Sequence, residues 1–194
     1  MGKGRLEAFS DGVIAIIITI MVLELKVPDG HTLEALRPLA AKFSAYTMSF
    51  VYVGIYWNNH HHLLHTVKRV DGWIMWANMN LLFWLSLVPI GTGWIGETGA
   101  APWPTVLYAC MLFMCGVSWL LLQRAIIRAD RENSQLARAI GSDWKGKMSG
   151  VGYAFSVGLA FVDTRISVAI FVALAIVWLI PDRRISRAVE PESD

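Results

Sequence analysis

Apolar residues along this chain are gathered into six stretches, which shorter polar or charged segments separate. A helix needs about 20 mostly apolar residues to cross a bilayer, and most of these stretches approach or exceed that length. The pattern therefore predicts an all-α integral membrane protein with six transmembrane helices in a single domain, residues 1–194. The predicted spans are residues 5–27, 43–64, 72–94, 105–123, 148–162 and 166–180.

The first stretch is unusual because its uninterrupted apolar part is too short to span a membrane alone. From Gly12 to Leu23 it contains one polar side chain, Thr19, and Glu24 closes it. To reach the required length the helix must take Ser10 and Asp11 toward the membrane. An ionisable side chain is costly in lipid and normally faces a polar partner or a water-filled path. The first helix is therefore the candidate functional element.

Helical periodicity places part of this stretch on one face. At about 100° per residue, Ile16, Thr19 and Leu23 share a stripe with Gly12, while Asp11 lies about a quarter turn to one side. Two interpretations of Thr19 remain open. Its hydroxyl can bond a backbone carbonyl of its own helix, as threonines in membranes often do. Alternatively, the stripe lines an axis that several copies of the chain share.

The same stretch carries a dense motif, and weaker matches follow in the next two helices. The motif comprises Arg5, Phe9, Ser10, Asp11, Gly12, Val13, Ala15, Ile16, Thr19, Leu23 and Glu24, and the later positions are Trp57, His60, His61, Asn80, Leu81 and Pro89. This pattern resembles the first-helix signature of the transmembrane protein 175 family, whose members are potassium-permeable channels. Its bacterial members carry one six-helix unit per chain.

The resemblance implies a function, an assembly and roles for named residues. It implies a homotetramer in which four copies of the first helix line a central pore. K⁺ and other monovalent cations would pass through it without a cofactor, and Ile16, Thr19 and Leu23 would form the constriction. It also implies a structural network that holds the first helix against the second. Its members would be Arg5, Phe9, Ser10, Asp11, Trp57, His60 and His61.

Composition and charge agree with a membrane location. Hydrophobic residues make up 55% of the chain, and nine tryptophans suit anchoring at the surfaces of a lipid bilayer. A formal net charge of +2 is too small to indicate nucleic-acid binding. Most lysines and arginines fall on the side of the predicted bundle that carries both termini. The positive-inside rule then predicts a multi-pass protein of the cell (inner) membrane with both termini in the cytoplasm.

Other chemistries find less support. The histidines around His61 lack the carboxylates that a zinc or iron site would want, so no metal site is predicted. Cys110 and Cys115 are expected to be reduced. No enzyme motif is present, which predicts a protein that is not an enzyme. The alternative is a proton-coupled secondary transporter that uses Asp11 and the histidines. A structural membrane protein without conduction is a third class.

Overall fold

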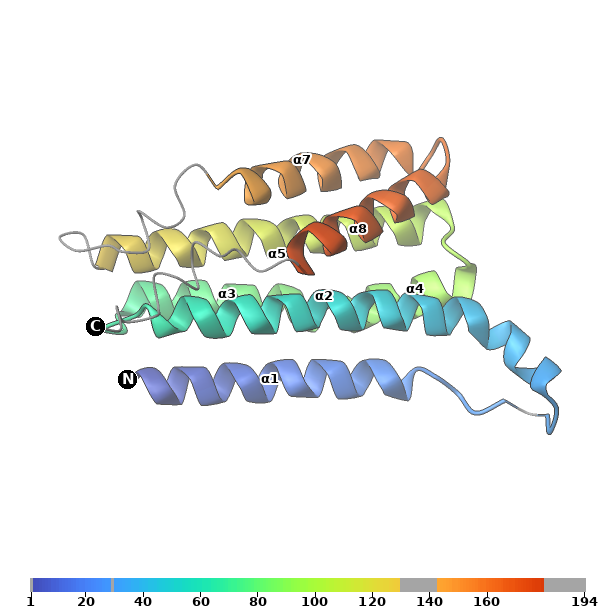
Figure 1. Cartoon of the computed structure of the whole chain (residues 1–194), viewed down its shortest axis with the longest axis horizontal. Helices are drawn as coiled ribbons and strands as arrows, with labels where there is room; N and C mark the ends of the chain where they lie inside the picture. The colour runs from blue at the N-terminus through green and yellow to red at the C-terminus, as the bar shows by residue number, and fades with distance from the viewer. Residues whose placement is uncertain (1, 29, 130–142, 180–194) are drawn as a thin grey trace, which may run out of the picture.

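The computed structural model describes residues 2–28, 30–129 and 143–179, and all regular secondary structure in them is helical. Figure 1 shows long helices packed side by side, with the start of α1 and the end of α8 directed toward the same end of the bundle. The helices are α1 (Lys3–Leu23), a 3-10 helix (Leu33–Leu39), α2 (Ala40–His65), α3 (Gly72–Ser86), α4 (Val88–Thr98), α5 (Pro102–Ala129), α7 (Trp144–Leu159) and α8 (Thr164–Leu179).

The six predicted spans correspond to α1, α2, α3 with α4, α5, α7 and α8, although their ends differ. α1 ends at Leu23 instead of Val27, and α5 continues six residues past Gln123, to Ala129. α2 begins at Ala40, and α7 begins at Trp144 rather than at Met148. Residue 180, the predicted end of the sixth span, lies outside the described residues.

In the part of the chain that the structure describes, three segments are long and apolar enough to cross a membrane: α1, α3 together with α4, and α5. α8 is apolar but has only 16 residues, and α7 has the same length. α2 has 26 residues, but its second half carries two asparagines and four histidines. Length and composition therefore identify half of the predicted spans directly. By the same criteria α2 is too polar, and α7 and α8 are too short.

The third predicted span is interrupted, as a proline in its middle would require. α3 ends at Ser86 and α4 begins at Val88, so Leu87 separates them. Pro89 has no backbone N–H, so it cannot donate the helical hydrogen bond to the carbonyl one turn earlier. Ile90 and Gly91 instead both donate to the Leu87 carbonyl, at 3.1 and 3.4 Å, and so restart the helix.

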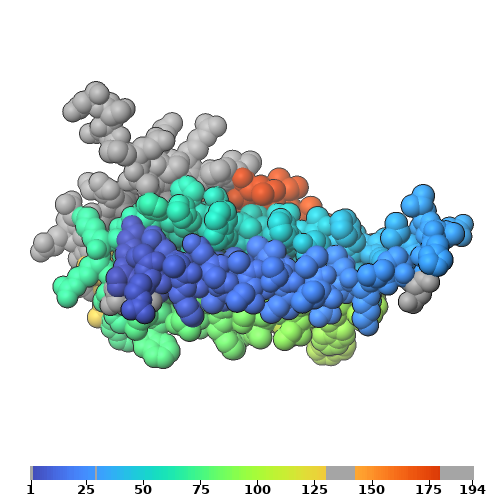
Figure 2. Space-filling view, turned by 90° about the horizontal axis from the view of Figure 1, so that it is seen from below, coloured from blue at the N-terminus to red at the C-terminus, as the bar shows by residue number. Residues whose placement is uncertain are grey.

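The bundle leaves α1 at its edge. α5 contacts α3, α4, α7 and α8, whereas α1 packs only against α2, α3 and α4 among the helices with several contacts. In Figure 2, α1 lies along the outer surface of the molecule, over α2 and the α3–α4 segment. One side of α1 therefore joins the core of the bundle and the other faces outward.

The close packing of α4 on α5 yields a stability prediction. A Cβ atom at Gly91 would lie 3.0 Å from Sδ of Met111 and 3.0 Å from Cδ2 of Tyr108. Replacing Gly91 by valine should force these side chains apart, at a typical cost of about 1–3 kcal/mol for an overpacked core. Thermal unfolding in detergent should show a lower midpoint. The matched control is Gly93→Val, where the nearest atom would be 3.6 Å away. Equal midpoints for the two variants would contradict the packing argument.

Candidate functional site

Two faces of α1 differ sharply in burial. The face that packs on the bundle is formed by Leu6, Ser10, Ile14, Ile17 and Met21, all of which are buried. The opposite face carries Ile16, Thr19 and Leu23, and Ile16 and Leu23 are 58% and 78% exposed. The three residues predicted to share a stripe therefore do so on the outward side. In the single chain this stripe has no protein partner from the described residues.

The Thr19 hydroxyl bonds its own helix. Its Oγ1 donates to the carbonyl oxygen of Ile16 at 2.8 Å. In the single chain, Thr19 therefore makes the local backbone hydrogen bond that the first of the two interpretations described. A hydroxyl has one donor and two acceptor lone pairs, so this bond occupies the hydrogen and leaves the acceptor sites of the oxygen. Thr19 thus presents an electron-rich oxygen on an otherwise apolar stripe.

Asp11 joins α1 to α2 at the surface. Trp57 Nε1 donates to Asp11 Oδ1 at 2.9 Å, although both side chains are exposed in the single chain. The Trp57 ring stacks on His61, with ring centroids 6.5 Å apart, and His61 lies 4.7 Å from His65 by the same measure. Asp11 is therefore held by an indole, and the histidine rings extend this contact along α2.

A second, buried hydrogen-bond chain fixes α1 from the inside. The His60 ring nitrogen Nε2 lies 2.6 Å from Asn78 Oδ1, and Asn78 Nδ2 donates to Ser10 Oγ at 2.9 Å. Ser10 Oγ in turn donates to the Leu6 carbonyl at 2.8 Å. All three polar side chains are buried. Because an amide oxygen only accepts, His60 Nε2 must carry the hydrogen in this arrangement.

The predicted network is therefore divided, and one member was missed. Asp11, Trp57 and His61 form the surface group, whereas Ser10 and His60 belong to the buried chain that Asn78 completes. Arg5 and Phe9 lie exposed on α1, and within the described residues Arg5 makes no hydrogen bond or ion pair to either group. The sequence signal for Asn78 was an asparagine in an apolar span, which needs a polar partner in a membrane.

The described residues, 2–28, 30–129 and 143–179, contain no group of three or more histidine, cysteine or acidic side chains that could hold a metal ion. His61 and His65 are close, but no carboxylate or cysteine among these residues joins them. The polar groups around α1 thus support helix packing through hydrogen bonds.

These contacts predict unequal effects for two substitutions. Asn78→Leu removes both hydrogen bonds of the amide and leaves His60 Nε2 without a partner in the core, at about 1–3 kcal/mol for the unpaired group, while Ser10 keeps its bond to the Leu6 carbonyl. Asp11→Asn keeps an acceptor oxygen for Trp57 at an exposed site, so about 1 kcal/mol or less is expected. Thermal unfolding in detergent should rank Asn78→Leu well below Asp11→Asn. The reverse order would place the main anchor of α1 at its surface.

A family model and full-length relatives match this chain. The model described as endosomal/lysosomal potassium channel TMEM175 matches residues 5–89, which include most of α1 and all of α2 and α3. A potassium channel of Chryseobacterium sp. (strain P1-3) is 51% identical over 98% of this chain and 99% of its own length. A potassium channel of Streptomyces collinus is 35% identical, and the alignment covers 91% of each chain.

A solved structure shows the same fold. The crystal structure of a lysosomal potassium-selective channel TMEM175 homolog from Chamaesiphon minutus superposes with a TM-score of 0.78 at 28% sequence identity. The match covers 93% of this chain and 97% of that one. The human endosomal/lysosomal proton channel TMEM175 is 37% identical over 103 residues, which are 47% of this chain and 19% of the human protein. All of these relatives are named as ion channels and none as an enzyme.

The motif in the first helix thus indicated the correct family. The prediction of an all-helical, multi-pass membrane protein that is not an enzyme is confirmed. Nearly complete coverage of relatives above 30% identity decides the family. This chain belongs to the TMEM175 family of ion channels.

Proposed function

We propose that this protein is a potassium-permeable cation channel that conducts passively across the cell membrane. The observation that carries the proposal is the outward stripe of Ile16, Thr19 and Leu23 on a helix that the family motif marks. The named function of the full-length bacterial relatives supports potassium as the permeant ion. Residues 1–194 would act as one six-helix channel domain without a cofactor.

The proposed channel is a homotetramer with four copies of α1 around a central axis. A single α1 cannot enclose a pore, so copies of the chain must assemble, and closed symmetry is the usual solution. The exposed stripe of α1 supports this arrangement because no other described residue of the single chain covers it. The number four follows the family resemblance. The remaining helices would form the outer ring and face the lipid.

Conduction would be controlled by apolar rings. Ile16 and Leu23 are seven residues apart, or about 10 Å along the helix axis at 1.5 Å per residue. Four branched side chains at each level would exclude water, and a dewetted gap is a barrier to any ion. Opening must then move these side chains apart or rotate them away from the axis, because an apolar ring cannot replace the hydration of a charge.

Selectivity would be moderate for a related reason. Ile and Leu rings offer no oxygen ligands, unlike filters that are built from backbone carbonyls. The acceptor lone pairs of Thr19, one helical turn from each ring, would be the nearest oxygen atoms on the stripe. Discrimination between K⁺ and Na⁺ would therefore rest on size, dewetting and these hydroxyls.

The remaining parts of the proposal are the contacts that hold α1 in place and the orientation of the chain in the membrane. The surface contact of Asp11 with Trp57 and the buried chain from His60 to Ser10 would hold α1 at a fixed rotation about its axis. Arg5, Phe9 and His61 would belong to the same structural region. Both termini would lie in the cytoplasm, as the excess of positive charge on that side favours.

The alternative is proton-coupled transport through Asp11 and the histidines of α2. A relay would need a continuous path between these groups. Asp11 bonds Trp57, whereas the buried chain that starts at His60 ends on the backbone of α1. Currents measured in liposomes or planar bilayers under asymmetric K⁺ and Na⁺ separate the two functions. Passive current that follows the electrochemical gradient would support the channel. Saturable flux that requires a proton gradient would instead show that the protein is a transporter.

The position of the main barrier gives a direct test. Ile16→Asn keeps similar bulk but wets the ring, so single-channel current should rise and the preference for K⁺ should weaken. The control is Ile18→Asn, because Ile18 is half-buried against the core rather than on the outward stripe. It should disturb folding without widening the path. A larger current for Ile18→Asn than for Ile16→Asn would mean that another face of α1 meets the axis.

The role of Thr19 gives a separate test. Thr19→Val preserves the shape of the side chain and removes its oxygen. The ratio of K⁺ to Na⁺ permeability should fall while current persists, and the reversal potential in asymmetric solutions measures it. An unchanged reversal potential would show that the hydroxyl serves only the bond to the Ile16 carbonyl.

A further inference from the structure

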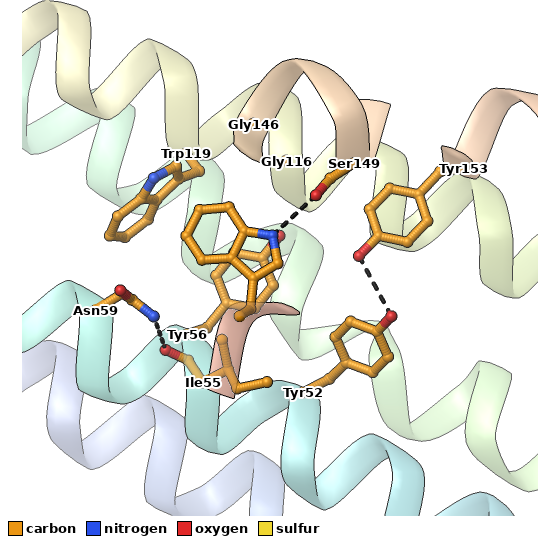
Figure 3. A pocket seen from close by; sticks show the side chains of 10 residues that line it. Tyr52, Ile55, Tyr56, Asn59, Gly116, Trp119, Gly146, Ser149 and Tyr153 are labelled. Atoms are coloured by element: carbon orange, nitrogen blue, oxygen red, sulfur yellow. Dashed lines mark hydrogen bonds between the residues drawn. The ribbon is translucent and has the colours of Figure 1, made fainter. Parts of the chain in front are cut away.

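The second half of α2 carries two asparagines and four histidines, and most of these side chains are hydrogen-bonded within the protein. Figure 3 shows Asn59 in the wall of a small cavity, where its Nδ2 donates to the Ile55 carbonyl at 2.8 Å. His60 belongs to the buried hydrogen-bond chain described above. His62 Nδ1 lies 2.7 Å from the Asn58 carbonyl oxygen and donates to it, because a carbonyl only accepts. Two of the histidines remain outside these bonds.

His61 and His65 are these two residues. They are four positions apart on α2, so they lie on the same face of the helix, one turn from each other. Both side chains are exposed, their ring centroids are 4.7 Å apart, and neither ring makes a hydrogen bond to another described residue. The Trp57 ring stacks on His61 and limits the movement of that ring. The pair therefore presents ring nitrogens that no other described group uses.

The pair lies at a surface of the membrane rather than in its middle. His65 is the last residue of α2, and the loop that follows contains the exposed residues Lys68 and Arg69. The His65 carbonyl accepts a hydrogen bond from Lys3 Nζ at 2.9 Å, at the end of the bundle where α1 begins (Figure 1). An ion dissolved in water can therefore reach the two rings without crossing lipid.

The spacing of the two rings fits two ligands of one metal ion. An imidazole nitrogen binds a transition-metal ion at about 2.1 Å, and the ring centroid lies about 1.1 Å behind that nitrogen. Two imidazoles at about 90° around one ion then have centroids about 4.5 Å apart, and at a tetrahedral angle the centroids are about 5.2 Å apart. The observed 4.7 Å is closer to the first value. Because both side chains are exposed, small rotations about their bonds can aim one nitrogen of each ring at the shared position.

The chemistry of the ligands selects the kind of ion. Imidazole nitrogens suit Cu²⁺, Ni²⁺ and Zn²⁺, whereas Mg²⁺ and Ca²⁺ prefer oxygen ligands. Zinc sites usually have three or more protein ligands, and the described residues supply no third histidine, cysteine or acidic group that completes such a site. Cu²⁺ and Ni²⁺ take tetragonal arrangements, in which water can fill the remaining positions. The positive charges of Lys68 and Arg69 in the following loop disfavour a cation that is held by charge alone.

We propose that His61 and His65 bind one Cu²⁺ or Ni²⁺ ion per chain, each through one ring nitrogen, with water completing the coordination. The two ligands come from adjacent turns, so the bound ion holds the last turn of α2 together. That turn also accepts the hydrogen bond from Lys3, and His61 supports the Trp57 ring that bonds Asp11. The ion therefore stabilises the end of α2 against which the start of α1 packs.

The experiment uses the untagged full chain in detergent, stripped of metal with a chelator and then titrated with Cu²⁺ by calorimetry. Wild type should bind one ion per chain. His61→Gln and His65→Gln should each bind at least about ten-fold more weakly, because even changes to groups that only support a metal ligand cost about 10–100-fold. The controls are His62→Gln, beside the pair, and His31→Gln, in the connection between α1 and α2. Both controls should bind as wild type does.

Two further measurements separate this site from adventitious binding. The electron paramagnetic resonance spectrum of bound Cu²⁺ should show two nitrogen ligands in wild type and fewer in His61→Gln or His65→Gln. Ni²⁺ should raise the thermal unfolding midpoint of wild type but not of these variants, because an ion that binds the folded chain stabilises it. Equal binding by wild type and both variants, displacement of Cu²⁺ by excess Mg²⁺, or no binding at all would overturn the proposal. Loss of binding in His62→Gln would also overturn it, since other ligands would then hold the ion.

Discussion

The rotation of α1 about its own axis is the constraint on which the rest of the site depends. Near the start of α1, the side chain of Asn78 on α3 bonds both Ser10 on α1 and His60 on α2, so one polar side chain joins three helices. Toward the other end, Met21 is buried and its sulfur lies 3.9 Å from Thr92 Oγ1 on α4. Because these contacts fall on one side of the helix, they determine that Ile16, Thr19 and Leu23 face outward. In a membrane such hydrogen bonds matter because lipid offers no competing partner.

The interruption between α3 and α4 also helps to fix the helices relative to one another, farther along the bundle. Thr92 Oγ1 lies 2.6 Å from Ser49 Oγ, which lies 2.8 Å from the Tyr108 hydroxyl, so α4 is joined to α2 and α5. Thr92 also donates to the Val88 carbonyl, within the first turn after the break at Leu87. The restart of the helix thus places a buried hydroxyl where three helices meet. The proline is part of the architecture rather than a tolerated defect.

The sequence predicted the helices better than their contacts. Hydrophobic stretches located every described α-helix but not the 3-10 helix Leu33–Leu39, and periodicity grouped Ile16, Thr19 and Leu23 correctly, because both depend on local spacing. The limits of α1 and α5 were less certain, since helices end where caps and turns form rather than where hydrophobicity ends. Asn78 was missed as the partner of Ser10 and His60 because 68 residues separate it from Ser10, and no local pattern encodes that contact.

Exposure alone does not say what α1 faces. In lipid, outward Ile16 and Leu23 cost little, because the acyl chains are as apolar as the side chains. The composition of the stripe is more informative: Gly12 and Thr19 are small, and a Cβ atom at Gly12 would meet nothing within 4 Å. Small residues at membrane helix surfaces are typical of sites where helices approach each other closely. A stripe that alternates small residues with branched aliphatics suits helices that converge at some levels and form apolar rings at others. This pattern favours an axis shared by copies of α1 over a surface that only meets lipid.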